Sequence, residues 1–186
     1  MPDSWRNSSS STRSRPVSVP ASIYNTDLAY ATVKAALQAR LNILAGDLAN
    51  VTHVRILTDP ANPDVVTVVL SYEGVEYSYT ISSSTQEAVF LKTRTPNTDG
   101  TFSIVEYDAQ GRKVKESTEN AQGTVTLLKT YRYNQPEEIV TIDHINGTIK
   151  VSRLMPDGTA GETLKNGYFG DRNANGLCYA LRGVDE

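Results

Sequence analysis

The chain has 186 residues, a formal net charge of -3 and a single cysteine. This length suits one ordinary domain with an appendage and excludes two full-sized catalytic lobes. The net charge excludes a protein whose whole surface binds nucleic acid, and one cysteine excludes a disulfide framework or a cysteine-rich zinc site. No apolar run is long enough to span a membrane, and the first twenty residues lack the apolar segment of a signal peptide.

Residues 1–22 form an arm rich in serine, proline and arginine. Without periodic apolar positions it has no burial to offset the backbone entropy of ordering, about 1–2 kcal/mol per residue. The alternatives are a disordered tail and an extended arm that lies on a neighbouring subunit. We expect the arm to bind such a partner through Trp5, Arg6, Arg13, Arg15, Val17 and Val19. Three arginines without interleaved aromatic residues argue against nucleic acid as that partner.

Residues 23–96 are predicted to form a helix and a β-hairpin. The side chains of Asn25, Thr26 and Asp27 suit a helix N-terminus, and Gly46 is expected to end the helix. An apolar stripe at helical spacing follows that start and predicts the face that packs on the sheet. It consists of Tyr30, Val33, Leu37, Leu41, Leu44 and Leu48.

The clearest local pattern is a hairpin between residues 64 and 83, closed by Glu73-Gly74. This turn predicts the pairs Tyr72 with Val75, Leu70 with Tyr77, Val68 with Tyr79 and Val66 with Ile81. One face is then continuously apolar, whereas a shift of one residue would invert the two faces, so the register is well specified.

Two shorter segments flank the hairpin. Residues 51–57 are expected to form a strand, followed by a loop over residues 59–63. Ser84 and Glu87 have the spacing of a capping box, which predicts a short helix over residues 85–92. A strand over residues 88–93 is the alternative.

The C-terminal part, residues 97–186, contains repeated hairpins. Gly-Thr followed by an alternating strand begins at Gly100, Gly123 and Gly147, which are 23 and 24 residues apart. Each copy continues into a second turn, so three copies predict about six antiparallel strands in a meander. The segment Tyr107 to Arg112 resembles the turn of the YD-repeat family of bacterial toxins, wall-associated proteins and some phage proteins. The resemblance implies strand-and-turn repeats within residues 100–160, and we infer no activity from it.

Few residues suggest chemistry. His53 and His144 lie in separate strand-like segments, and neither has sequence-adjacent residues that resemble a metal site or a triad. The carboxylates of Glu116 with Glu119, and of Glu137 with Glu138, are expected to be solvated charges in loops and turns. Cys178 is expected to be a buried, inert thiol, because no activating base is apparent.

Asp171, Asn173 and Asn175, followed by Gly176, match the first half of a calcium-binding loop. The twelfth position is Arg182, so the carboxylate that closes such a site is missing. A polar turn before a final strand explains the same residues, and a calcium ion is the alternative. We expect no other cofactor.

The sequence therefore predicts a mainly β protein: an antiparallel meander or sandwich with one N-terminal amphipathic helix and an extended N-terminal arm. In organisation it resembles virion proteins of tailed phages, such as decoration, neck, tail or fibre-adaptor proteins. That resemblance implies a non-enzymatic assembly protein that binds neighbouring subunits, located in a virion assembled in the host cytoplasm. The alternative is a YD-repeat-like binding module at the cell surface or in a toxin, which recognises glycan or protein.

Overall fold

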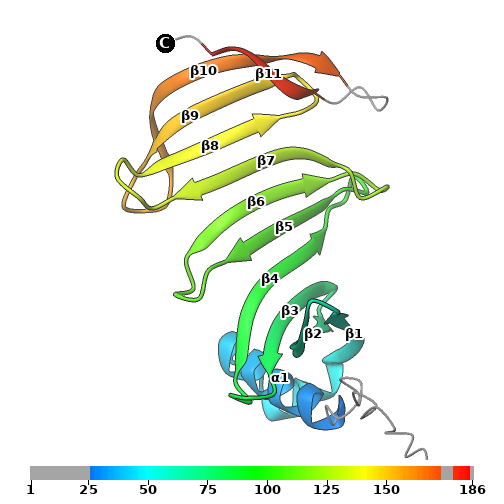
Figure 1. Ribbon diagram of the computed structural model, residues 1–186. Coiled ribbons are helices and arrows are strands. Elements are labelled where there is room, and N and C mark those ends of the chain that lie inside the picture. The colour runs from blue at the N-terminus through cyan, green and yellow to red at the C-terminus, as the bar shows by residue number, and fades with distance from the viewer. Residues whose placement is uncertain (1–25, 173–177, 185–186) are drawn as a thin grey trace, which may run out of the picture.

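The computed structural model describes residues 26–172 and 178–184, with side chains as far as Tyr168. It contains one antiparallel sheet whose strands follow one another in chain order from β1 to β11 (Figure 1). The helices are α1 (Thr26–Leu41) and the 3-10 helix η2 (Ala45–Asn50). The strands are β1 (Thr52–Asp59), β2 (Asn62–Tyr72), β3 (Val75–Ser82), β4 (Ala88–Pro96), β5 (Phe102–Tyr107), β6 (Lys113–Glu119), β7 (Val125–Arg132), β8 (Glu138–Asp143), β9 (Thr148–Leu154), β10 (Ala160–Arg172) and β11 (Cys178–Val184).

The mainly β meander and its single α-helix are confirmed. The predicted repeats correspond to the six strands from β5 to β10, two for each copy. The sandwich alternative is wrong for the described residues, because all of their strands belong to one sheet. The arm, residues 1–22, lies outside the described residues.

Helix α1 begins at Thr26, with Asp27 in its first turn, and ends earlier than predicted. Asn42 adopts a left-handed conformation with φ of 52°, and the Ile43 N–H donates to the Gln38 carbonyl over 3.1 Å. This is a Schellman-type C-cap, in which asparagine takes the position usual for glycine. Gly46 therefore plays no part in the helix end. Leu44, predicted on the buried stripe, is 72% exposed.

The hairpin of β2 and β3 has the predicted register at every pair, from Tyr72 opposite Val75 to Val66 opposite Ile81. Glu73 and Gly74 both have positive φ, 50° and 80°, as the right-handed twist of a two-residue hairpin requires. Strand β1 pairs with β2 and starts within one residue of the prediction.

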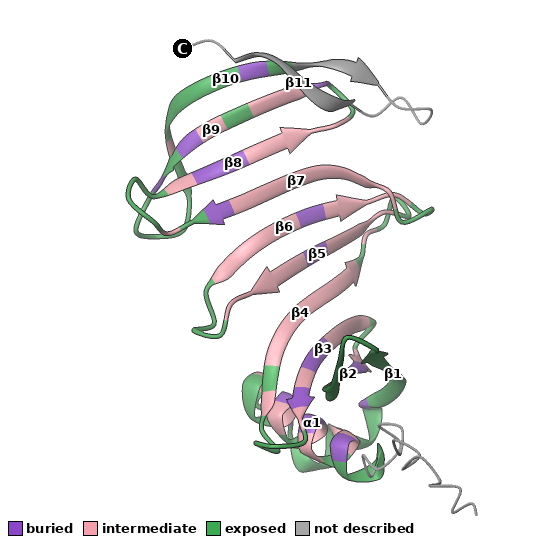
Figure 2. Cartoon of the chain, viewed as in Figure 1, coloured by how far each residue is buried: buried purple, intermediate pink, exposed green. Residues whose placement is uncertain are grey.

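The main core lies between α1 and the sheet formed by β2, β3 and β4 (Figure 2). Val33 and Leu37 of the helix are fully buried, as are Val68 and Leu70 of β2. Tyr79 and Ile81 extend this core along β3. The hairpin face and the helix stripe thus meet as predicted, except at Leu44.

The short helix predicted over residues 85–92 is wrong, and the strand alternative is confirmed by β4. Gln86 has a φ of 56°, which a helix does not permit, and the hydroxyl of Ser84 contacts that of Ser82 rather than capping a helix. Phe90 packs on the main core from β4. Tertiary packing of this apolar side chain outweighs the capping pattern.

Four of the turns between strands have the same hydrogen bonds. In each, the first residue donates its N–H to the carbonyl of the fifth, and the glycine at the fourth position donates to the carbonyl of the first. These turns are residues 97–101, 108–112, 120–124 and 155–159, and their glycines have φ between 77° and 83°. The turn that contains Gly147 differs, because there the Asp143 carboxylate accepts the N–H groups of Ile145 and Asn146.

Substitution of Val68 tests the assignment of the faces. A Val68→Asp variant places an unpaired charge in the core and should lower the free energy of unfolding by about 3–5 kcal/mol. Thr67→Asp, on the opposite face and only partly buried, should cost far less. Urea denaturation measures both variants, and equal losses would contradict the assignment.

Tyr79 offers a second test, because its buried hydroxyl has no hydrogen-bond partner among the described residues. Burial raises its pKa to about 12. Tyr79→Phe removes an unsatisfied group and should leave the free energy of unfolding unchanged or raise it by up to about 1 kcal/mol. Tyr131→Phe is the matched control: its hydroxyl donates to the Glu116 carboxylate over 2.6 Å, so that variant should lose about 1.5–3 kcal/mol. A larger loss at Tyr79 than at Tyr131 would refute this account.

Candidate interaction surface

The sheet has two faces that differ in what covers them. We call the face that carries Val68, Tyr79 and Phe90 the helix face, because α1 packs there. We call the opposite face, which carries Thr67, Glu76 and Arg94, the open face. Helix α1 contacts β2, β3 and β4, and elsewhere in the described chain extensive contacts join only neighbouring strands. Strands β5 to β9 are therefore a single layer (Figure 1).

Aromatic side chains close the main core at the edge of the helix. The rings of Tyr79 and Phe90 are 5.1 Å apart, and those of Phe90 and Tyr107 are 5.0 Å apart. The Arg40 guanidinium, from the last turn of α1, lies 3.7 Å from the Phe90 ring centre. Such a cation over an aromatic face stabilises the end of the helix against β4 and β5.

Beyond this point both faces carry apolar residues, and on the open face one mainly apolar row crosses the strands. Ile104, Ser117, Leu128, Ile142 and Ile149 are direct cross-strand partners and form one row across β5 to β9 on the open face. On the helix face, the neighbouring row is mostly polar and consists of Val105, Glu116, Lys129, Thr141 and Lys150. We call the first set the apolar row. Ile104 and Ser117 are buried by neighbouring side chains, and Leu128, Ile142 and Ile149 are half-buried. No described helix or second sheet covers the row.

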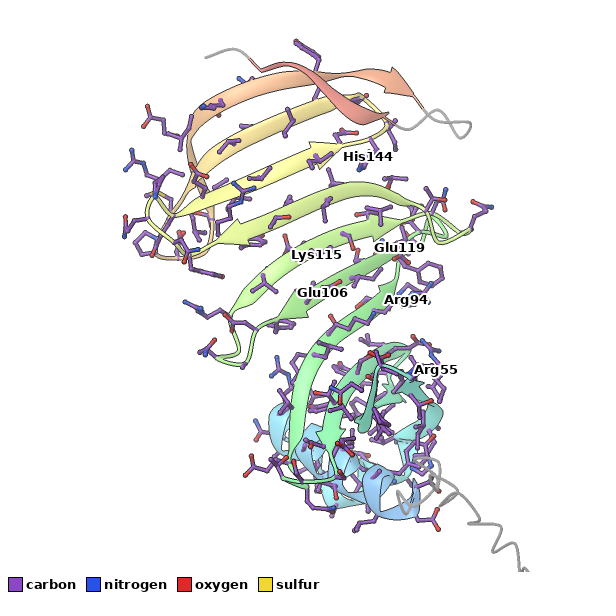
Figure 3. The ribbon with its side chains drawn as sticks, viewed as in Figure 1. Arg55, Arg94, Glu106, Lys115, Glu119 and His144 are labelled. Atoms are coloured by element: carbon purple, nitrogen blue, oxygen red, sulfur yellow. The ribbon has the colours of Figure 1, made fainter. Side chains whose placement is uncertain are left out.

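Charged side chains flank the apolar row on the open face. Lys115 and Glu106 form an ion pair at 3.3 Å, with Lys92 next to Glu106 in register (Figure 3). On the other side, Arg94 contacts Glu119 at 3.9 Å and lies 3.5 Å from the Phe102 ring centre. Each exposed pair contributes only about 0.2–1 kcal/mol. Their position matters more, because an apolar centre with a charged rim is typical of a protein interface.

On the helix face, Glu116 organises a polar cluster. Its carboxylate accepts hydrogen bonds from Lys113 and from the Tyr131 hydroxyl, and lies 3.8 Å from Lys129. Partial burial raises the pKa of Glu116, but these donors outweigh it and the net pKa is lowered. Burial and the Glu116 carboxylate both raise the pKa of Tyr131. A shallow hollow of about 220 Å³ lies beside the cluster, lined in part by Ser103, Thr118 and Leu127.

The predicted partner-binding and calcium residues fall largely outside the described chain. This is true of Trp5, Arg6, Arg13, Arg15, Val17 and Val19, and of Asn173 and Asn175. Asp171 lies in β10, where its backbone pairs with Ala180 of β11, and Cys178 pairs with Arg172. Residues 173–177 thus connect two antiparallel strands, and the calcium site stays a prediction.

The two histidines are far apart in the sheet. His53 lies at the start of β1 and its ring stacks on Tyr30, with 3.7 Å between ring centres. His144 was predicted in a strand but lies in the turn after β8, where its N–H donates to the Thr126 carbonyl. The fixed turn around the Asp143 carboxylate ends the strand there.

The paired carboxylates are also placed differently from the prediction. Glu116 and Glu119 are strand residues rather than turn residues, and they lie on opposite faces of β6 with different basic partners. Glu138 lies in β8 and contacts Arg132 at 3.7 Å, whereas Glu137 is exposed in the preceding turn. Neither predicted pair forms a joint acid-base site.

Sequence reasoning missed the apolar row, although the repeats contain a signal for it. Aligning the three Gly-Thr segments places Ile104, Leu127 and Val151 at equivalent positions. A bulge between the pairs Thr118–Leu127 and Glu119–Val125 shifts β7 by one residue, so that Leu128 occupies the row. The alignment alone could not reveal this shift.

Within residues 26–172 and 178–184, no group of three or more potential metal-binding side chains is present. None of the helices described is long and apolar enough to cross a membrane. No protein-family model, curated protein or solved structure matches the chain significantly.

The carboxylates that organise the turns predict acid sensitivity. In Asp99 and Asp157, a hydrogen bond from the next threonine hydroxyl lowers the pKa. In Asp108 and Asp143, partial burial raises the pKa, but hydrogen bonds from the turn have the larger effect, so the net pKa of each carboxyl group is lowered. A carboxyl group whose pKa is lower in the folded state than in the unfolded state stabilises the fold at pH values above its unfolded-state pKa of about 4. This stabilisation is lost as the pH falls through the folded-state pKa.

The urea midpoint should therefore be flat between about pH 8 and pH 5 and fall below about pH 4. An Asp99→Asn/Asp157→Asn variant keeps oxygen acceptors in two turns but removes their titration, so its midpoint should fall less steeply. A midpoint that does not change down to about pH 3 would contradict this origin of the acid sensitivity.

Proposed function

We propose that the protein is a non-enzymatic assembly component that binds neighbouring subunits through the open face and edges of its sheet and through its arm. The apolar row is the observation that carries the proposal. Its side chains lie on a single layer of strands, flanked by ion pairs and covered by no described element. A partner that packs there would supply the second layer that such a sheet otherwise lacks.

The size of this surface suits such a contact. The row crosses five strands, and adjacent strands are about 4.8 Å apart, so it extends for roughly 20 Å. Specific protein interfaces bury about 800 Å² on each partner. The apolar row with its charged rim is wide enough to form the centre of such an interface.

The absence of catalysis is also part of the proposal. Among the described side chains, His53 and His144 lie in different parts of the sheet, and Glu116 and Glu119 lie on opposite faces. A virion of a tailed phage is the kind of particle we propose, because a small β protein with an extended arm suits its assembly.

The second candidate is a YD-repeat-like binding module at a cell surface or in a toxin. One observation favours it: the Asp108 turn, which suggested that family, has the hydrogen-bond pattern of three other turns. The Asp108 carboxylate accepts the N–H groups of Gln110 and Arg112 and the Arg112 guanidinium. Glycan-array binding, enhanced by calcium, would favour this candidate over the assembly component.

Substitution in the apolar row tests the main proposal. Ile142→Lys places a charge in the row and should prevent co-sedimentation of a tagged chain with its native assembly. Its melting temperature should change little, because Ile142 is only half-buried in the single chain. Thr141→Lys, the adjacent residue on the helix face, is the matched control and should co-sediment normally. If both variants behaved like the wild type, the row would not be the interface.

A further inference from the structure

Strand β1 is one of the two free edges of the sheet. It pairs with β2 on one side, and within the described chain no strand lies on its other side. Every β1 residue except Ile56 is exposed, including the apolar side chains of Val54 (39%) and Leu57 (49%). Unpaired N–H and C=O groups with exposed apolar side chains favour the addition of another strand.

The charge of the chain is polarised along the sequence. Between residues 42 and 87, Arg55 is the only basic residue apart from His53, and it forms an ion pair with Glu76 at 3.2 Å. The same segment carries six carboxylates: Asp47, Asp59, Asp64, Glu73, Glu76 and Glu87. The arm has the opposite sign, with three arginines against one aspartate. The segment that contains β1 is therefore acidic overall and the arm is basic, so the two segments are electrostatically complementary.

The arm joins the fold beside this edge. Tyr30, one turn into α1, stacks on His53 at the start of β1. Thr26, at the start of the helix, is about 6 Å along the helix axis from Tyr30. The arm of each copy therefore begins close to that copy's own β1 edge, so copies that meet near these edges would have each arm within reach of the other copy's β1.

The arm also has a sequence suited to an added strand. Val17 and Val19 alternate with Ser18, which would place both valines on one face. Pro20 lacks an N–H group and is tolerated in an outermost strand, where that position can face solvent. Arg13 and Arg15 lie on the N-terminal side of this segment and carry charge opposite to that of the segment between residues 42 and 87.

We propose that residues 13–23 of a second copy of this chain add as a strand to the free edge of β1. The inference rests on the proposed function and deepens it, because it names the arm's partner and its place on that partner. Backbone hydrogen bonds hold the added strand, Val17 and Val19 contact Val54 and Leu57, and the arginines face the carboxylates. Repetition of this contact links copies in a head-to-tail series.

Photo-crosslinking of the full chain tests this contact. Val19 is replaced by a photoreactive phenylalanine derivative in unlabelled chains, which are mixed with unmodified chains labelled with nitrogen-15. After irradiation, mass spectrometry should find links between unlabelled residue 19 and labelled peptides that contain residues 52–59. The same probe at Gln110, in the exposed β5–β6 turn, is the control and should give no link to β1. An Arg13→Glu/Arg15→Glu variant should reduce the yield about tenfold.

Three results would overturn the inference: links confined to a single chain, links to a part of the partner other than β1, or no links between chains. Two further measurements distinguish failure of the arm contact from failure of the proposed function. They are sedimentation velocity on the same sample and co-sedimentation with the native assembly. An assembled chain whose links avoid β1 refutes only the arm contact. A chain that neither self-associates nor enters an assembly refutes both.

Discussion

The structure depends on one constraint: a β-sheet has two faces, and the described chain has one α-helix with which to cover them. Helix α1 covers the helix face over β2, β3 and β4, where Val33 and Leu37 meet Val68 and Leu70. Its last turn reaches only as far as Phe90 and Tyr107, through Arg40. From β5 onward no described helix covers the sheet, so cross-strand pairs and turns must stabilise the strands that a core stabilises at the N-terminal end.

The single layer is held together locally. Four turns have the same hydrogen bonds, and side-chain acceptors such as Asp99 and Asp108 fix them. Ion pairs such as Lys115–Glu106 join adjacent strands. Buried side chains there are few: the small cluster of Tyr131, Ile139 and Leu154, and separate residues such as Ile104 and Val140. Each of these contributions is about 1 kcal/mol or less and depends on the neighbouring strand being in place. The C-terminal strands are therefore expected to gain more from a partner than the N-terminal core does.

The parts of the fold that follow local rules were predictable from the sequence. The Glu73-Gly74 turn fixed the register of β2 and β3, and the Gly-Thr repeats gave six strands in the correct order. The wrong predictions concern segments whose structure depends on details that the local sequence pattern does not specify. Phe90 extends β4 against a capping pattern, Asn42 ends α1 before Gly46, and a bulge in β7 moves Leu128 into the apolar row. The apolar row could not be foreseen, because both faces of strands β5 to β9 contain apolar residues.

The sheet carries two separate candidate surfaces, the β1 edge and the apolar row. The β1 edge belongs to the part of the sheet that packs against α1, so an added strand would extend a sheet that already has a second layer. The apolar row lies four to eight strands away from that edge, on the part that lacks a second layer. A strand added at the edge and a partner packed on the row would not compete for the same residues. In the proposed assembly, one copy can therefore hold two different neighbours at once, which a protein that covered both faces with its own helices could not do.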